Sequence, residues 1–241
     1  MRLENILVLD AEKNRIVKKP KSKTVACHRI FIVEDHPVFR EGLVQLVNGE
    51  TDLEVCGATD NAKQAFRDIG RLNPELALVD ISLPGKNGLE LIKELRAANR
   101  KAKLLVVSMH DEAIYADRVL RAGGDGYIMK EEDPQEIIHA IRDVLAGHIY
   151  VSEEVLAGST NGTSKRSREP APSRLDKLTD SELEILELLG GGSSDQEIAG
   201  KLGLTPGIVN SRCREMQKKL NLKHGNELIR FAVCWIESGS A

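Results

Sequence analysis

Short apolar runs alternate with helical patterns between residues 28 and 150. The apolar runs show no polar alternation, which is typical of strands buried on both faces of a parallel sheet, although the pattern alone also fits a buried helical segment. Between them, residues such as Phe39, Leu43 and Leu46 recur at helical spacing. This order predicts a doubly wound α/β domain with a five-stranded parallel sheet. The expected strands are 30–33, 53–58, 76–79, 104–107 and 127–129.

Two of these runs end in carboxylates. Glu34 and Asp35 follow the first run, and Asp80 follows the run at 76–79, ahead of turn residues that include Pro84. A single Asp in such a place commonly caps a turn, but the carboxyl ends of neighbouring parallel strands share the sheet edge where open α/β sheets bind ligands. Two like charges about 4 Å apart repel by roughly 4 kcal/mol at an effective dielectric of about 20, so a convergence here needs a cation or raised pKa values. Oxygen ligands with room for water favour magnesium.

Two further polar residues follow apolar runs at the same expected edge. Ser108 comes after the run at 104–107, and Lys130 comes after the run at 127–129. A hydroxyl and an ammonium beside carboxylates and a divalent cation are typical of a site for a phosphoryl group. We therefore expect Asp80 to be the nucleophile that carries this group.

With these residues, 28–150 resembles the receiver domain of two-component response regulators, which has a flavodoxin-like fold. Tyr127 stands at the family's switch aromatic and Ser108 at its Ser/Thr position, while Glu131 departs from the proline common after the lysine. The resemblance implies that a histidine kinase or phosphotransfer protein phosphorylates Asp80. It also implies a homodimer after phosphorylation, through helices near 112–121 and 134–146. The implied magnesium ligands are Glu34 or Asp35, Asp80 and the main-chain carbonyl of Ser82.

The carboxyl-terminal part of the chain predicts a small helical domain. Thr179 and Glu182 form a capping box, Ser194 and Glu197 form a second, and Thr205-Pro206 marks a further helix start. Two helices joined by a short Gly-containing turn predict a helix-turn-helix. We therefore divide the chain into an unassigned extension (1–27), a receiver domain (28–150), a flexible linker (151–177) and a helix-turn-helix domain (178–238).

The helix-turn-helix region resembles the LuxR-type, or NarL-type, DNA-binding domain. The resemblance rests on framework residues that include Leu178-Thr179, Glu197-Ile198-Ala199 and Leu202-Gly203. Around the third helix of this domain, Val209, Cys213, Met216 and Leu220 share one side and are expected in the core. The opposite side is expected to contact double-stranded DNA through Asn210, Ser211, Arg214 and Lys218.

Composition adds few constraints. The net charge is −3, and most of the acidic excess lies in residues 28–150, so the total charge does not argue against DNA binding by the carboxyl domain. The four cysteines lack the short paired spacings of zinc sites or dense disulfide frameworks. The amino-terminal apolar run is too short for a signal peptide and no stretch is long enough to span a membrane, so we expect a cytoplasmic protein.

Two other functions fit part of the sequence. A phosphatase of the haloacid dehalogenase type also places a nucleophilic Asp after a strand, but it usually has a second acid two residues later, where this chain has Ser82. A regulator whose helix-turn-helix docks onto protein is the other alternative. The favoured interpretation is a transcription factor without enzymatic activity, phosphorylated on Asp80 and bound to DNA through its carboxyl domain.

Overall fold

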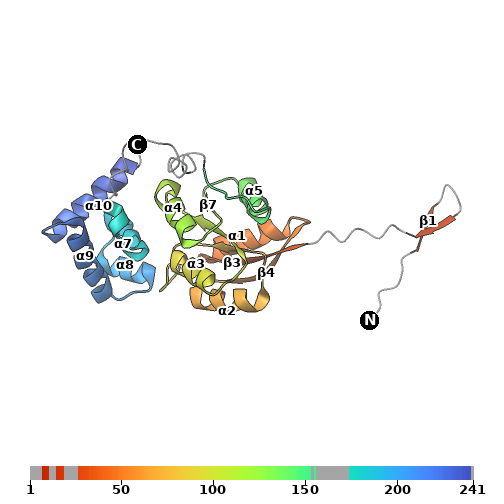
Figure 1. The fold of residues 1–241 in the computed structure, drawn as a ribbon, viewed down its shortest axis with the longest axis horizontal. Helices are drawn as coiled ribbons and strands as arrows, with labels where there is room; N and C mark the ends of the chain where they lie inside the picture. The colour runs from red at the N-terminus through yellow and green to blue at the C-terminus, as the bar shows by residue number, and fades with distance from the viewer. Residues whose placement is uncertain (1–6, 11–14, 19–26, 153–154, 156–173, 240–241) are drawn as a thin grey trace.

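A five-stranded parallel sheet forms the centre of the amino-terminal domain (Figure 1). The computed structural model describes residues 7–10, 15–18, 27–152, 155 and 174–239. The strand order is β4-β3-β5-β6-β7, so the chain crosses over to build the sheet on both sides of β3. This confirms the doubly wound fold, and each strand lies within two residues of its expected bounds. The strands are β3 (His28–Val33), β4 (Leu53–Thr59), β5 (Leu76–Val79), β6 (Lys103–Ser108) and β7 (Gly126–Met129).

Helices cover both faces of this sheet. Alternate strand residues point to opposite faces, so Ile30 and Ile32 belong to one apolar core whereas Phe31 and Val33 belong to the other. The first core is closed by α1 (Pro37–Asn48) and α5 (Pro134–Leu145). The second is closed by α2 (Ala62–Leu72), α3 (Gly88–Ala97) and α4 (Glu112–Ala122).

The strand ends lie level with one another at one edge of the sheet. Val33 pairs with Val79, and Ser108 pairs with Met129. The residues that follow continue this alignment, because Asp80 N–H donates to the Val33 carbonyl at 2.9 Å and Lys130 N–H donates to the Ser108 carbonyl at 2.8 Å. The register therefore brings the polar residues after the strands to a common edge.

Gly88 allows the start of α3 to approach the end of β5. A Cβ atom at this position would lie 2.0 Å from the main-chain oxygen of Asp80. No side chain fits at that distance, so the close approach requires glycine. The hydrogen bond from Gly88 N–H to the Ile81 carbonyl, 2.8 Å long, holds the same turn.

The carboxyl-terminal domain is a helical bundle that follows the short 3-10 helix η2 (Arg174–Lys177). Both predicted capping boxes are confirmed, at Thr179 with Glu182 and at Ser194 with Glu197. Gly203 ends the second helix of this domain with φ 62°, in the left-handed region that favours glycine. The helices are α7 (Asp180–Gly190), α8 (Asp195–Leu202), α9 (Pro206–Leu220) and α10 (Gly225–Gly239).

The two domains are in direct contact. Figure 1 shows α7 and α8 beside α3 and α4, with α9 on the outer side. Asp180, the first residue of α7, accepts hydrogen bonds from Lys93 of α3 at 2.7 Å and Arg118 of α4 at 3.1 Å. The Gly85 N–H also donates to the carbonyl of Leu202 at 2.9 Å. These contacts place the carboxyl domain against the segment that follows Asp80.

Two segments assigned from the sequence are described only in part. Within the extension at 1–27, β1 (Leu7–Asp10) pairs antiparallel with β2 (Arg15–Lys18). Most of the expected linker lies outside the described residues, but its last four residues form η2, and the Leu175 carbonyl accepts a hydrogen bond from Arg118 at 2.7 Å. Among the helices that the structure describes, none combines the length and apolarity needed to cross a membrane.

Candidate functional site

Lys130 joins two buried carboxylates at the edge of the sheet. Its Nζ atom lies 2.9 Å from Asp80 Oδ2 and 2.7 Å from Glu34 Oε2. Asp80 is 3% exposed and Glu34 is 1% exposed. Phe39 adds a cation-π contact, because the Lys130 ammonium lies 4.8 Å from its ring centroid. The convergence expected of these three strand-end residues is therefore present in the structure.

The electrostatics of this cluster follow from burial and charge. Burial raises the pKa of the Asp80 carboxyl, although Lys130 acts in the opposite direction. Burial and then the charge of Asp80 raise the pKa of the Glu34 carboxyl. Burial disfavours the charge of Lys130, but Asp80 and Glu34 outweigh it and raise the pKa of the ammonium. The cluster thus favours the charged form of Lys130, whereas burial opposes the charged forms of Asp80 and Glu34.

Oxygen ligands for a divalent cation lie next to this cluster. Glu34, Asp35 and His36 each offer a ligand atom, and these atoms all lie within 4.8 Å of one another. The His36 N–H donates to Glu34 Oε1 at 3.0 Å, which holds that carboxylate in place. The carboxylate oxygens of Glu34 and Asp35 suit magnesium, and the partial exposure of Asp35 leaves room for the water molecules that this ion retains. His36 was not among the site residues expected from the sequence. Its position directly after the acidic pair could have indicated that it lies at the same site.

Ser108 and Tyr127 are both buried close to the cluster, and a histidine connects them. The Tyr127 hydroxyl donates to the main-chain carbonyl of His110 at 2.6 Å, and the His110 N–H donates to Ser108 Oγ at 3.3 Å. The His110 Nε2 atom lies 2.8 Å from Ser82 Oγ. The pattern of apolar runs gave no signal for His110, because the residue lies in the loop after β6 rather than at the strand end.

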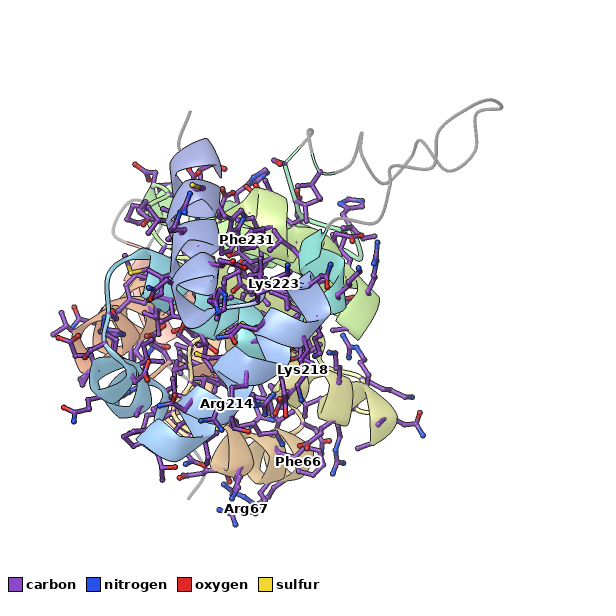
Figure 2. All side chains as sticks on the ribbon, turned by 90° about the vertical axis from the view of Figure 1, so that its left-hand side faces the viewer. Phe66, Arg67, Arg214, Lys218, Lys223 and Phe231 are labelled. Atoms are coloured by element: carbon purple, nitrogen blue, oxygen red, sulfur yellow. The ribbon has the colours of Figure 1, made fainter. Side chains whose placement is uncertain are left out.

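The residues expected to contact DNA lie together on α9. Asn210, Ser211, Arg214 and Lys218 are all exposed. Figure 2 views the molecule from the side of the carboxyl domain and shows Arg214 and Lys218 on α9, facing the viewer. On the opposite side of the helix, Val209, Met216 and Leu220 are buried and Cys213 is half-buried.

One of these residues has a partner that the sequence did not indicate. Asn210 Nδ2 donates to Asp195 Oδ2 at 2.8 Å, across the turn between α8 and α9. The same Nδ2 makes a second, longer contact of 3.5 Å to the Pro206 carbonyl, and the amide oxygen has no hydrogen-bond partner among the described residues. An amide oxygen and N–H are the pair of groups that can bind an adenine edge. Asp195 therefore orients the Asn210 amide at the amino-terminal part of α9.

Comparisons with protein families and relatives agree with these two sites. The family described as "Response regulator receiver domain" matches residues 30–142, and the family described as "Bacterial regulatory proteins, luxR family" matches residues 176–232. The nitrate/nitrite response regulator protein NarL of Escherichia coli K12 is 32% identical over 212 residues, which cover 86% of this chain and 94% of NarL. The oxygen regulatory protein NreC of Staphylococcus carnosus is 31% identical over 209 residues, which cover 85% of this chain and 96% of NreC.

Solved structures show the same folds. A LuxR-family two-component response regulator from Aurantimonas sp. SI85-9A1 is 30% identical, with a TM-score of 0.52 over 56% of this chain and 96% of the other. RcsB from Salmonella enterica serovar Typhimurium, bound to promoter rprA in the presence of phosphomimetic BeF3-, is 20% identical, with a TM-score of 0.58 over 86% of this chain and 98% of the other. At that identity the likeness to RcsB concerns the fold alone. The chain belongs to the NarL/LuxR family of response regulators, with a receiver domain and a LuxR-type DNA-binding domain.

Proposed function

We propose that Asp80 accepts a phosphoryl group from a histidine kinase or a phosphotransfer protein. The observation that carries this proposal is the buried strand-end carboxylate of Asp80, 2.9 Å from the Lys130 ammonium. During transfer, an Asp80 oxygen forms a bond to phosphorus while the bond from phosphorus to the donor's imidazole nitrogen breaks. Lys130 stabilises negative charge on the phosphoryl oxygens, and the Ser108 hydroxyl, at the end of β6 on the same sheet edge, supplies a further donor.

We propose that Glu34, Asp35 and Asp80, with the main-chain carbonyl of Ser82, hold a magnesium ion. The ligand atoms of Glu34 and Asp35 lie within 4.8 Å of each other, which supports the part of these two residues in the set. When bound, magnesium neutralises charge on the carboxylates and the phosphoryl oxygens. The Lys130 ammonium contacts both Glu34 and Asp80, at 2.7 and 2.9 Å, so it balances charge on the two buried carboxylates.

Incubation with labelled acetyl phosphate and magnesium tests the phosphorylation site. Wild type should take up covalent label, and the Asp80→Asn variant should not. Asp60→Asn is the matched control, because Asp60 is exposed and follows β4, another strand of the same sheet. Equal labelling of Asp80→Asn and wild type would refute the assignment.

We propose that the exposed face of α9 contacts specific DNA as the output of the protein. Its exposed Asn, Arg and Lys side chains and the LuxR-family match support DNA over a protein partner. RcsB, which shares the fold, is bound to promoter DNA in its solved structure. A selection of bound fragments from genomic DNA, followed by gel-shift assays, tests this. Failure to retain any fragment, phosphorylated or not, would favour a protein-docking role.

We propose that phosphorylation favours a homodimer through the exposed surfaces of α4 and α5. In this structure, Tyr115 and Arg118 of α4 contact the carboxyl domain. Pairing through the part of α4 that carries Tyr115 and Arg118 would therefore require this domain to leave the receiver first. Sedimentation with and without beryllofluoride tests the proposal, and an unchanged monomer at high protein concentration would contradict it.

A further inference from the structure

The aromatic ring of Phe39 covers part of the Lys130 ammonium. The Nζ atom lies 4.8 Å from the ring centroid, and the same atom contacts Asp80 and Glu34. The Lys130 side chain is 7% exposed, so little water reaches this contact. A cation over an aromatic ring is attracted by the negative face of the ring, and the attraction grows as water is excluded. Phe39 is therefore an uncharged partner of Lys130.

The course of α1 explains why Phe39 reaches this site. β3 and β4 are parallel, so α1 must begin at the carboxyl end of β3 and return toward the start of β4. The Cα–Cβ bonds of a helix tilt toward its amino terminus, so Phe39, in the first turn of α1, leans toward the sheet edge that carries Asp80. Leu43, one turn later, is buried in the core against which Phe39 packs. Phe39 thus lies where this apolar row meets the polar site.

Arg40 fixes the first turn of α1 to the acidic end of β3. Its Nη1 atom donates to the main-chain carbonyls of Glu34 at 2.7 Å and Asp35 at 3.3 Å. The Arg40 N–H donates to the His36 carbonyl at 2.9 Å. Because Phe39 directly precedes Arg40, these hydrogen bonds leave its ring little freedom to move away from the site.

The two carboxylate partners of Lys130 are groups that the proposed reaction engages. Asp80 is the proposed phosphoryl acceptor, and both Asp80 and Glu34 are proposed magnesium ligands. Phe39 has neither role, because an aromatic ring offers no oxygen to a metal or to phosphorus. Of these three contacts, the ring is the one for which neither the cation nor the phosphoryl group competes. Its share in holding the ammonium should therefore grow when the carboxylates gain new partners.

We propose that Phe39 is a positioning residue that holds the Lys130 ammonium at the phosphoryl group through the face of its ring. The inference rests on the proposed function of Asp80. Because attraction to the ring uses no directional hydrogen bond, the ammonium can turn an N–H from the Asp80 carboxylate to a phosphoryl oxygen while it stays over the ring. Loss of this attraction should weaken phosphoryl binding even where the apolar packing at position 39 is kept.

Fluorinated phenylalanines at position 39 of the full chain separate the attraction from the packing. Fluorine withdraws electron density from the ring face with little change in size, so the attraction falls stepwise from phenylalanine to its mono-, di- and trifluoro forms. The readout is the half-saturating concentration of beryllofluoride in the presence of magnesium, followed by the fluorine NMR signal of the bound probe. The same series at Phe66 is the matched control. The Phe66 ring centroid lies 6.0 Å from the guanidinium of Arg100, which precedes β6 at the opposite edge of the sheet.

Each added fluorine at position 39 should raise the half-saturating concentration, by about fivefold in total for the trifluoro form, whereas the Phe66 series should stay within about twofold of wild type. Phe39→Leu, which keeps an apolar side chain, should lose at least as much affinity as the trifluoro form. An unchanged value across the fluorinated Phe39 series would overturn the role of the ring face, even if Phe39→Leu had an effect, and would leave Phe39 a packing residue.

Proton NMR of Lys130 tests the geometry in the protein without magnesium. The ring current of Phe39 should shift the ε-methylene protons of Lys130 upfield, and Phe39→Leu should abolish this shift. The shift should persist after beryllofluoride and magnesium are added. Its loss on addition of the probe would show that the lysine leaves the ring and would contradict the proposal. Failure of wild type to bind beryllofluoride, or binding by Asp80→Asn, would instead refute the proposed function of Asp80.

Discussion

The ammonium of Lys130 lies 2.9 Å from the carboxylate of Asp80, and both side chains are almost completely buried. Removing one partner of a buried ion pair is strongly destabilising, because the other charge then stays unpaired in a medium of low dielectric. Removing the Lys130 ammonium would leave two buried carboxylates without their partner, because Lys130 also lies 2.7 Å from Glu34. The pair therefore serves both the stability of the receiver and the chemistry proposed for Asp80.

Replacing Lys130 by Met should destabilise the receiver by about 3 to 5 kcal/mol. The change leaves Asp80 and Glu34 buried beside each other without a cation. Urea unfolding monitored by circular dichroism measures the loss. Adding Asp80→Asn should restore part of the stability, whereas the exposed Lys101→Met control should stay within about 0.5 kcal/mol of wild type. An unaltered midpoint for Lys130→Met would contradict the ion-pair assignment.

Gly88→Ala should disturb the site without removing any polar group. The added Cβ would meet the Asp80 carbonyl oxygen at 2.0 Å, so the turn between β5 and α3 must shift. We expect slower labelling by acetyl phosphate together with a lower melting temperature. Gly42→Ala on α1 is the matched control, because a Cβ there meets no atom within 4 Å. That change should stabilise the helix by about 0.5 to 1 kcal/mol. Equal labelling rates in the two variants would count against the close approach.

The charged form of Glu182 should stabilise the carboxyl domain, and this stabilisation should be lost in acid. Burial disfavours its charge, but the hydrogen bonds from Lys219, at 2.6 Å, and from Thr179 outweigh burial and lower the pKa of Glu182. A lowered pKa means that the stabilisation is present above the ordinary carboxyl pKa and is lost as pH falls through the folded-state value. Glu182→Gln should therefore cost about 1 to 2 kcal/mol at pH 7 and less near pH 3.

Fluorescence of Trp235, the single tryptophan of the chain, reports this domain's unfolding. The exposed Glu215→Gln on α9 controls for loss of one negative charge. A cost for Glu182→Gln that is the same at both pH values would show that the charge of Glu182 is not what stabilises the fold.

Arg214→Ala and Asn210→Ala should each weaken binding to a selected DNA site by about 1 to 3 kcal/mol and relax its sequence specificity. Arg suits guanine, and the Asn210 amide, oriented by Asp195, suits adenine. Lys218→Ala should instead weaken binding to all sequences and reduce the salt dependence. Fluorescence anisotropy at several salt concentrations measures both effects. The control is Arg67→Ala, an exposed arginine on α2 of the receiver; a loss of affinity there equal to that of Arg214→Ala would contradict the α9 face.

Most of the fold followed from local pattern. Five apolar runs without alternation predicted the parallel sheet, and the capping boxes at Thr179 and Ser194 marked the starts of α7 and α8 correctly, because both signals depend on residues near in sequence. The strand-end positions of Asp80, Glu34 and Lys130 predicted their convergence for the same reason. A parallel register places such residues together whatever the details of packing.

The contacts between the two domains could not be predicted from local sequence pattern. His110 and Glu187 are far apart in sequence, and neither stands at a strand end or a helix cap. Likewise, Glu184 lies on the side of α7 that meets Asn87, a face that would be solvated in an isolated domain. Only the packing of one domain on the other makes these residues buried, and no periodicity within either domain encodes that packing.

Chemical mapping of the phosphorylated residue tests the central claim most directly. Borohydride reduction of the acyl phosphate formed with acetyl phosphate and magnesium converts a phosphorylated aspartate to homoserine, which peptide mass spectrometry locates in the sequence. We predict homoserine at position 80 in wild type and at no position in Asp80→Asn. Homoserine at Asp35 or at any other aspartate of the wild-type chain, with Asp80 intact, would contradict the account.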